Sequence, residues 1–140
     1  MRANSIIRTG SRWLLALFYA AAGYFHLVAP MPFLRILPEW VPAGEAVVIG
    51  TGVAELLGAG GLMQSWSMRL RRAAGVGLAI YALCVWPANF QHLLNDLARP
   101  DQGLGLGYHI PRLLAQPIIV WLALWASEAT NWPFARRISS

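Results

Sequence analysis

The sequence predicts an all-α integral membrane protein, a bundle of four membrane-spanning helices whose N- and C-termini both lie in the cytoplasm. Hydrophobic residues make up 57% of its 140 residues and charged residues only 12%, roughly half the charged share of a soluble domain. The apolar residues gather in four segments, each close to the ~20 residues that cross hydrocarbon as a helix. A soluble chain of this length would leave much of that apolar surface in water. We therefore expect residues 1–140 to form a single membrane domain.

The four segments cover about residues 13–29, 45–63, 73–94 and 110–127. The first follows three arginines and stays apolar for longer than the core of a signal peptide, which favours a retained helix over a cleaved leader. Pro87 and Pro117 interrupt the third and fourth segments, which membrane helices tolerate. The connection 30–44 contains four prolines, which preclude a long helix. The single cysteine, Cys84, lies in an apolar run and is expected to be a small buried hydrophobic residue.

The distribution of arginines predicts the orientation of the helices. All basic residues are arginines, and they cluster before the first segment, between the second and third, and in the C-terminal tail. The clusters are Arg2, Arg8 and Arg12; Arg69, Arg71 and Arg72; and Arg136 and Arg137. The positive-inside rule places these regions in the cytoplasm, and we expect a bacterial inner-membrane protein. A nucleic-acid partner is not expected despite the net charge of +5, because no basic stripe with interleaved aromatic residues is present.

One carboxylate, Glu55, lies near the middle of the second segment, where a charge is costly unless it is paired, protonated or hydrated. At a rise of about 1.5 Å per residue, the other segments place polar residues at or above the same depth, in the outer half of the bundle. These are His26 in the first segment, Asn89 in the third, and Arg112 and Gln116 in the fourth. We expect the five residues to form a shared cofactor-binding site, with Arg112 balancing the charge of Glu55.

The same residues also have structural interpretations. A buried ion pair between Glu55 and Arg112 would fix helix register, and Asn89 and Gln116 lie close to prolines, where an amide satisfies a freed carbonyl. The second segment also carries small residues on the face of Glu55, and such a face lets neighbouring backbones approach closely. The members of this face are Gly52, Glu55, Gly58 and Ala59.

The histidines give weak evidence for metal chemistry. No HxxH, HxxxH or ExxH spacing occurs, so no metal site is expected. A haem held by His26 with His92 or His109 finds no support in the helix phase. His26 has a local hydrogen-bonding role available near the turn at Pro30. His109, just before the fourth segment, is expected to be a solvated residue at the membrane interface.

Five short motifs follow one another along the chain. They are Gly23-Tyr-Phe-His26, Ile36-Leu-Pro-Glu-Trp-Val-Pro42, Gly52-Val-Ala-Glu55-Leu-Leu-Gly58, Trp86-Pro-Ala-Asn89 and Pro111-Arg112-Leu-Leu-Ala-Gln116. In this order they resemble the DoxX-like family of small four-helix membrane proteins. The last motif departs from the family pattern, which is closer to Arg-Leu-Pro-Leu-Gln, so any helix kink is displaced. The resemblance implies a four-helix membrane bundle, and some relatives are associated with a terminal quinol oxidase or thiosulfate:quinone oxidoreductase.

We therefore expect a small membrane subunit of a redox-linked system of the quinone or thiosulfate type, more an accessory oxidoreductase subunit than a self-sufficient enzyme. The candidate cofactor is a quinone, whose carbonyls need hydrogen-bond donors in an apolar slot and whose reduction needs a proton donor such as Glu55. Two alternatives stay open: a non-catalytic assembly or chaperone-like partner protein, and a small-molecule or ion carrier. The sequence is compatible with a membrane or redox protein partner in the lipid bilayer, and with a homo-oligomer.

Overall fold

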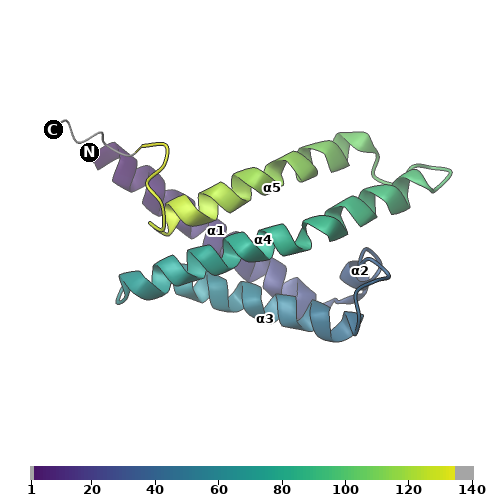
Figure 1. Cartoon of the computed structure of the whole chain (residues 1–140), viewed down its shortest axis with the longest axis horizontal. Helices are drawn as coiled ribbons and strands as arrows, with labels where there is room; N and C mark the ends of the chain where they lie inside the picture. The colour runs from purple at the N-terminus through teal and green to yellow at the C-terminus, as the bar shows by residue number, and fades with distance from the viewer. Residues whose placement is uncertain (1, 135–140) are drawn as a thin grey trace.

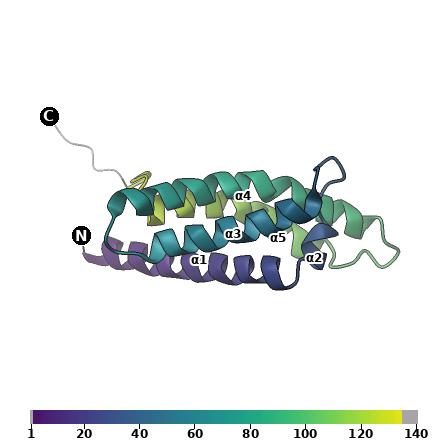
Figure 2. The same ribbon diagram turned by 90° about the horizontal axis from the view of Figure 1, so that it is seen from below.

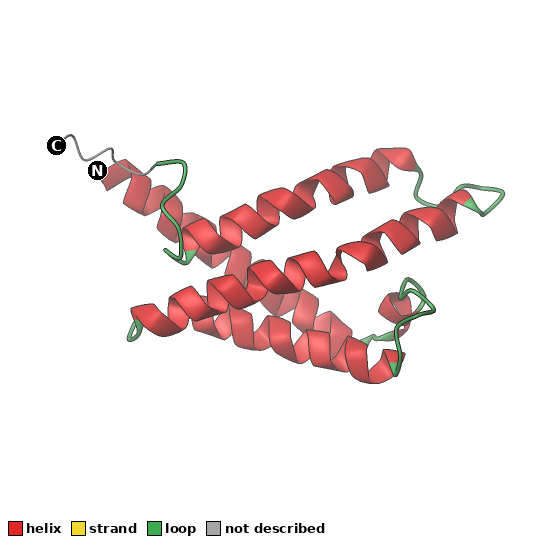
Figure 3. Ribbon diagram, viewed as in Figure 1, coloured by secondary structure: helices red, strands yellow, loops and turns green. Residues whose placement is uncertain are grey.

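The computed structural model describes residues 2–134 and is all-α, as predicted (Figure 3). Its elements are α1 (Arg2–Val28), α2 (Met31–Leu34), α3 (Gly44–Met63), α4 (Met68–Leu97) and α5 (Leu106–Ala126). The short α2 lies in the proline-rich connection for which no long helix was expected. Arg136 and Arg137, on which part of the predicted orientation rests, lie outside the described residues.

Three of the predicted membrane segments correspond to helices that are long and apolar enough to cross a membrane, namely α3, α4 and α5. α1 begins at Arg2 and not near residue 13: no proline separates the arginine-bearing tail from the apolar segment, and Gly10 does not interrupt the helix. Within the described residues α1 does not meet the same hydropathy condition. Arg12, His26 and two tyrosines lower its mean hydropathy.

The four long helices form two antiparallel pairs, with α1 packed on α3 and α4 packed on α5. α3 joins the pairs through its contact with α4 (Figures 1 and 2). At one end, here called the arginine end, α1 begins, α5 ends and α3 turns into α4. At the opposite end, here called the cavity end, lie α2 and the α4–α5 loop, and the two pairs diverge (Figure 1). The buried apolar core comprises Leu15, Ala16, Tyr19, Ala59, Leu62, Leu78, Ala79 and Ala123.

Glycines allow α1 and α3 to approach each other closely. A Cβ atom on Gly23 would lie 2.7 Å from the carbonyl oxygen of Gly52 and 2.9 Å from Leu56 Cγ. A Cβ atom on Gly52 would lie 2.7 Å from Cβ of His26. The small-residue face predicted for the second segment therefore packs against α1 of the same chain and brings α1 close to Glu55.

Large apolar side chains on every long helix point outward, for example Leu14, Leu57, Ile80 and Leu114. This arrangement suits a chain whose surroundings are hydrocarbon. Cys84 is also exposed, so the prediction that it is buried is wrong. It borders a cavity that opens between the helix pairs.

A buried glutamine fixes the turn between α3 and α4. The Nε2 group of Gln64 donates to the carbonyls of Gly61, at 3.1 Å, and Ser67, at 2.8 Å, and its Oε1 accepts from the Ser67 N–H at 2.9 Å. Ser67 is in turn the N-cap of α4 and accepts from the Leu70 N–H at 3.2 Å. One side chain thus satisfies groups that the helix ends leave unpaired.

We expect Gln64→Ala to lower the stability of the bundle by about 1–3 kcal/mol, because it leaves buried backbone groups without partners. The measurement is the midpoint of thermal unfolding in detergent, followed by circular dichroism. Ser65→Ala in the same turn is the control, because Ser65 is exposed and should leave the midpoint unchanged. Equal midpoints for the two variants would contradict this assignment.

Candidate functional site

A cavity of about 670 Å³ opens between the helix pairs on the cavity-end side of the core. All four long helices contribute to its wall. The connection 30–44 closes part of it with apolar side chains that include Phe33, Leu37, Trp40 and Val41. The five residues predicted to share a site, His26, Glu55, Asn89, Arg112 and Gln116, all line this cavity. Their contacts with one another differ from those expected.

Glu55 is buried, with 3% of its surface exposed. One side chain from α4 and one from α1 contact its carboxylate. Its Oε1 accepts a hydrogen bond of 2.7 Å from the Tyr81 hydroxyl of α4. Its Oε2 lies 2.8 Å from Nδ1 of His26 on α1. A carboxylate in an apolar wall is stabilised by such neighbours. The three side chains form what we call the Glu55 triad, which spans α1, α3 and α4.

A backbone carbonyl determines which tautomer His26 adopts. Its Nδ1 also lies 2.9 Å from the carbonyl oxygen of Ala22, which only accepts hydrogen bonds, so Nδ1 carries the hydrogen. Nε2 has no hydrogen-bond partner among the described residues, and it is therefore the nitrogen that takes up or releases a proton. The ring of Phe33 in α2 stacks on the imidazole with centroids 3.7 Å apart. The connection 30–44 thus contacts the triad through Phe33, on the side of the cavity end.

Arg112 does not balance the charge of Glu55, and this prediction is wrong. Its NH1 donates instead to Nδ1 of His92 at 2.7 Å, and the guanidinium lies 5.7 Å from the ring centre of Tyr108. The reason is topological: α5 packs on α4, so a side chain near the start of α5 meets the end of α4 first. Arg112 and Glu55 still border the same cavity from different helices.

The two buried amides in the cavity wall bind each other and the backbone. Asn89 Nδ2 donates to Oε1 of Gln116 at 3.3 Å, and Gln116 Nε2 donates to the carbonyl of Ala82 at 2.6 Å. Pro87 lacks the N–H that would bond the carbonyl of Leu83, four residues earlier, so Ala82 is not the carbonyl that this proline frees. The structural interpretation, in which each amide satisfies a carbonyl freed by its neighbouring proline, is therefore not what these hydrogen bonds show. Gln116 instead connects α5 to a backbone carbonyl of α4.

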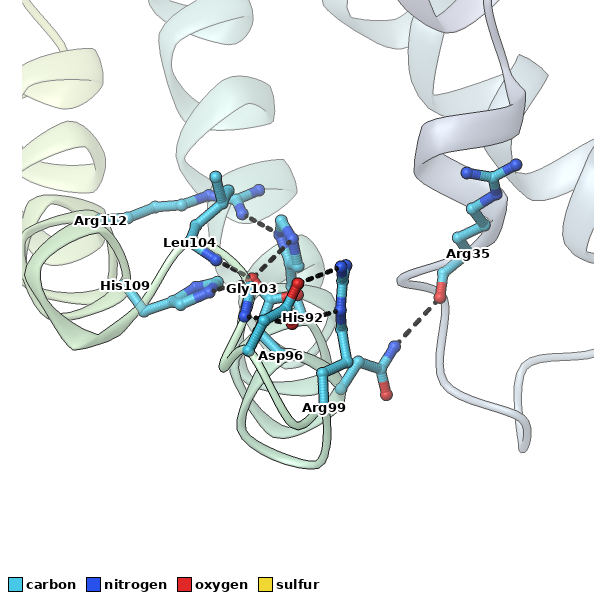
Figure 4. A network of polar contacts seen from close by, with 10 residues as sticks. Arg35, His92, Asp96, Arg99, Gly103, Leu104, His109 and Arg112 are labelled. Carbon is cyan, nitrogen blue, oxygen red and sulfur yellow. Dashed lines mark hydrogen bonds and ion pairs between the residues drawn. The ribbon is translucent and has the colours of Figure 1, made fainter.

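A second polar cluster lies at the cavity end, where α4 and α5 meet (Figure 4). Asp96 Oδ2 lies 2.9 Å from Nε2 of His109 and 3.7 Å from Nε2 of His92, and it accepts the Leu104 N–H at 2.9 Å. His109 is fully buried, so the prediction of a solvated interfacial residue is wrong. α5 begins at Leu106, earlier than predicted. His109 therefore lies in its first turn, where it contacts Asp96 of α4.

The loop between α4 and α5 is shaped by its own charges. Arg99 binds Asp101 through two hydrogen bonds of 3.0 and 2.9 Å, and Asp101 accepts from the Gly103 N–H at 3.1 Å. The Gly103 hydrogen bond and then Arg99 lower the pKa of Asp101 from its ordinary value. Gly103 has a positive φ of 53° and lies against the Asp96 carboxylate, which leaves no room for a side chain. The loop therefore presents Leu104 N–H to Asp96.

Sequence reasoning missed Tyr81 and the role of Asp96. Tyr81 lies in the middle of an apolar helix, and a tyrosine hydroxyl in that position needs an acceptor, so it was a detectable partner for Glu55. His92 and Asp96 are four residues apart in one helix and share a face. A search for HxxxD would have found them, whereas the patterns considered contained only His and Glu.

Comparison with known proteins identifies the family of the chain. A family model described as a domain of unknown function (DUF8561) matches residues 15–129, a range that holds both polar clusters. No curated protein and no solved structure matches the chain. Because the matched range covers most of its length, the chain belongs to the DUF8561 family.

Proposed function

We propose that this chain is a bacterial inner-membrane protein that binds a quinone-type molecule in its cavity and serves a redox-linked system as an accessory subunit. The observation that carries the proposal is the cavity of about 670 Å³ with a buried, paired carboxylate in its wall. The DoxX-like resemblance of the sequence points to the same class of function.

The size and lining of the cavity suit a lipid-soluble ligand. Sites for small molecules typically occupy roughly 300–1,000 Å³ and combine apolar walls with a few placed polar groups. Here the walls include aromatic and aliphatic side chains such as Phe18, Trp40 and Ile119, and the polar groups come from the Glu55 triad and Arg112. Arg112 has guanidinium N–H groups beyond the one on His92. They are candidate donors to a ligand carbonyl.

A bound quinone would supply the electron-accepting chemistry, and the chain's own residues would hold the protons. Glu55 accepts from Tyr81, and its Oε2 lies 2.8 Å from Nδ1 of His26, whose hydrogen is bonded to the Ala22 carbonyl. Nε2 of His26 is free to exchange a proton with the cavity, and the adjacent carboxylate would stabilise the charged imidazolium. No thiol pair is available, because the chain has a single cysteine. Electrons would therefore come from a partner protein or from the ligand itself.

The membrane arrangement that we propose has four spanning helices, α1, α3, α4 and α5, with the arginine end in the cytoplasm. A 20-residue helix such as α3 is about 30 Å long, which matches the hydrocarbon thickness. Exposed tryptophans lie at both ends, Trp66 and Trp132 at the arginine end and Trp40 at the cavity end. Tryptophan is enriched at the two membrane–water interfaces. The cavity then lies in the outer half of the bundle.

Assembly of another membrane protein is the alternative function. The hypothesis rested on the small-residue face of α3, which could bind a helix of another protein. Three glycines of α3 instead lie against side chains of this same chain: Gly52 against His26, Gly58 against Leu78 and Gly61 against Ala74. That use leaves the face with no room for a partner helix. A carrier function likewise lacks an inverted repeat in the sequence. The quinone-binding proposal therefore has the stronger support.

The cavity proposal is tested by filling the cavity. We expect Ala115→Phe, whose site lines the cavity, to weaken binding of decylubiquinone at least tenfold, because the ring takes ligand volume. Leu114→Phe on the outward face, where Leu114 is 64% exposed, is the control. Binding is measured by quenching of tryptophan fluorescence in nanodiscs. A wild-type protein that does not bind, or an Ala115→Phe variant that binds equally well, would contradict the proposal.

A further inference from the structure

The cluster at the cavity end contains three side chains of the kinds that bind transition metals. His92 and Asp96 come from one face of α4 and His109 from the first turn of α5. One ligand atom from each of the three lies within 4.8 Å of the others. Two donors bound to one tetrahedral ion are about 3.3 Å apart. The observed separations of 2.9 and 3.7 Å from Asp96 Oδ2 bracket that value.

The surroundings orient Asp96 and bury His109. Asp96 is 6% exposed and its Oδ2 accepts the Leu104 N–H, an outer hydrogen bond of the kind that orients metal-bound carboxylates. His109 is fully buried, and its Nδ1 has no hydrogen-bond partner among the described residues. A shift of the ring hydrogen to Nδ1 would leave a lone pair on Nε2 for the metal ion, which would have to offset the cost of a buried N–H without an acceptor. His26 differs, because the Ala22 carbonyl fixes its tautomer.

We propose that His92, Asp96 and His109 form a binding site for a divalent transition metal ion of the zinc class, with a fourth coordination position open. Two imidazoles and one carboxylate are a ligand set that suits Zn²⁺ and neighbouring ions better than Mg²⁺ or Ca²⁺. The site lies apart from the Glu55 triad, and Arg112 borders both the cavity and the metal ligands.

Arg112 competes with the metal ion for His92. Its NH1 donates to Nδ1 of His92, which keeps the hydrogen of the neutral ring on Nε2, the nitrogen nearest Asp96. Metal binding through Nε2 requires that hydrogen to leave, and the guanidinium also repels a cation. Binding of the ion would therefore displace Arg112 from His92. Removal of the arginine charge should favour the metal.

Titration with Co²⁺ tests the site, because its visible absorption reports ligation directly. The protein is purified with an affinity tag free of histidine, stripped of metal and held in nanodiscs, and bound Co²⁺ is then displaced with Zn²⁺. We expect one Co²⁺ per chain. Asp96→Asn and His109→Gln should each weaken binding at least tenfold, whereas Arg112→Gln should strengthen it. His26→Gln is the matched control, a buried histidine outside the cluster.

The expected changes in Co²⁺ affinity have opposite signs: the ligand variants weaken binding and Arg112→Gln strengthens it. If the cluster were only a structural hydrogen-bond network, loss of Arg112 would not raise the affinity for Co²⁺. Circular dichroism checks that each variant is folded. If Asp96→Asn does not fold, X-ray absorption of the wild-type protein with Zn²⁺ decides, and a shell of two imidazole nitrogens with oxygen supports the proposal. Absence of Co²⁺ binding by the wild type, or equal weakening by His26→Gln, would overturn it.

Discussion

Gly23→Val is expected to prevent the bundle from folding or to destabilise it by about 3 kcal/mol or more, at the upper end of overpacking effects. The first added atom would lie 2.7 Å from the carbonyl oxygen of Gly52, 2.9 Å from Leu56 Cγ and 3.1 Å from Glu55 Cβ. A backbone carbonyl has no rotamer to which it can withdraw, so α1 must move away from α3. The measurement is the yield of monodisperse protein and its thermal midpoint in detergent.

Gly10→Val is the matched control, because it lies in the same helix and a Cβ atom there meets nothing within 4 Å. Helix propensity favours replacement of glycine at either position, so an effect at Gly23 alone reports the contact. Equal stability of the two variants would show that α1 and α3 separate at little cost. It would also remove the explanation of why His26 lies next to Glu55, since Gly52 packs directly on His26.

The all-α fold and the five cavity residues could be predicted because depth follows from helix arithmetic. A rise of about 1.5 Å per residue locates Glu55 and Asn89 along their helices whatever the neighbouring helix. The partner of each residue depends instead on which helices pack together and how each is rotated. For that reason Arg112 lines the same cavity as Glu55 but was assigned the wrong partner, since α5 packs on α4.

The second polar cluster was not predicted because the helices extend further than the apolar segments of the sequence. The apolar pattern ends near residue 94 in the sequence, yet α4 continues to Leu97 and α5 begins at Leu106. Hydrogen bonds from the loop to Asp96 and Asp101 hold these polar turns, and hydropathy does not report such bonds. Asp96 and His109 therefore read as loop residues in the sequence, although both are buried in the structure.

The second large effect is expected at Glu55. Glu55→Leu removes the acceptor of the Tyr81 hydroxyl and the neighbour of the His26 Nδ1–H. Removal of one partner from a buried polar pair typically costs about 1–3 kcal/mol, and about 3–5 kcal/mol where a charge is left behind. We expect a loss of about 3 kcal/mol in the free energy of unfolding, measured by denaturant titration in mixed micelles. Glu55→Gln should lose less, because its amide oxygen still accepts from Tyr81.

A double-mutant cycle shows whether the loss comes from the Glu55–Tyr81 contact. Tyr81→Phe alone leaves the carboxylate without its 2.7 Å donor, and the double variant Glu55→Leu with Tyr81→Phe leaves neither group unpaired. Residues in direct contact typically couple by about 0.5–3 kcal/mol, so the double variant should be more stable than the sum of the single losses predicts. Strict additivity would mean that Glu55 is stabilised chiefly by His26. Tyr81 would then serve mainly as part of the cavity wall.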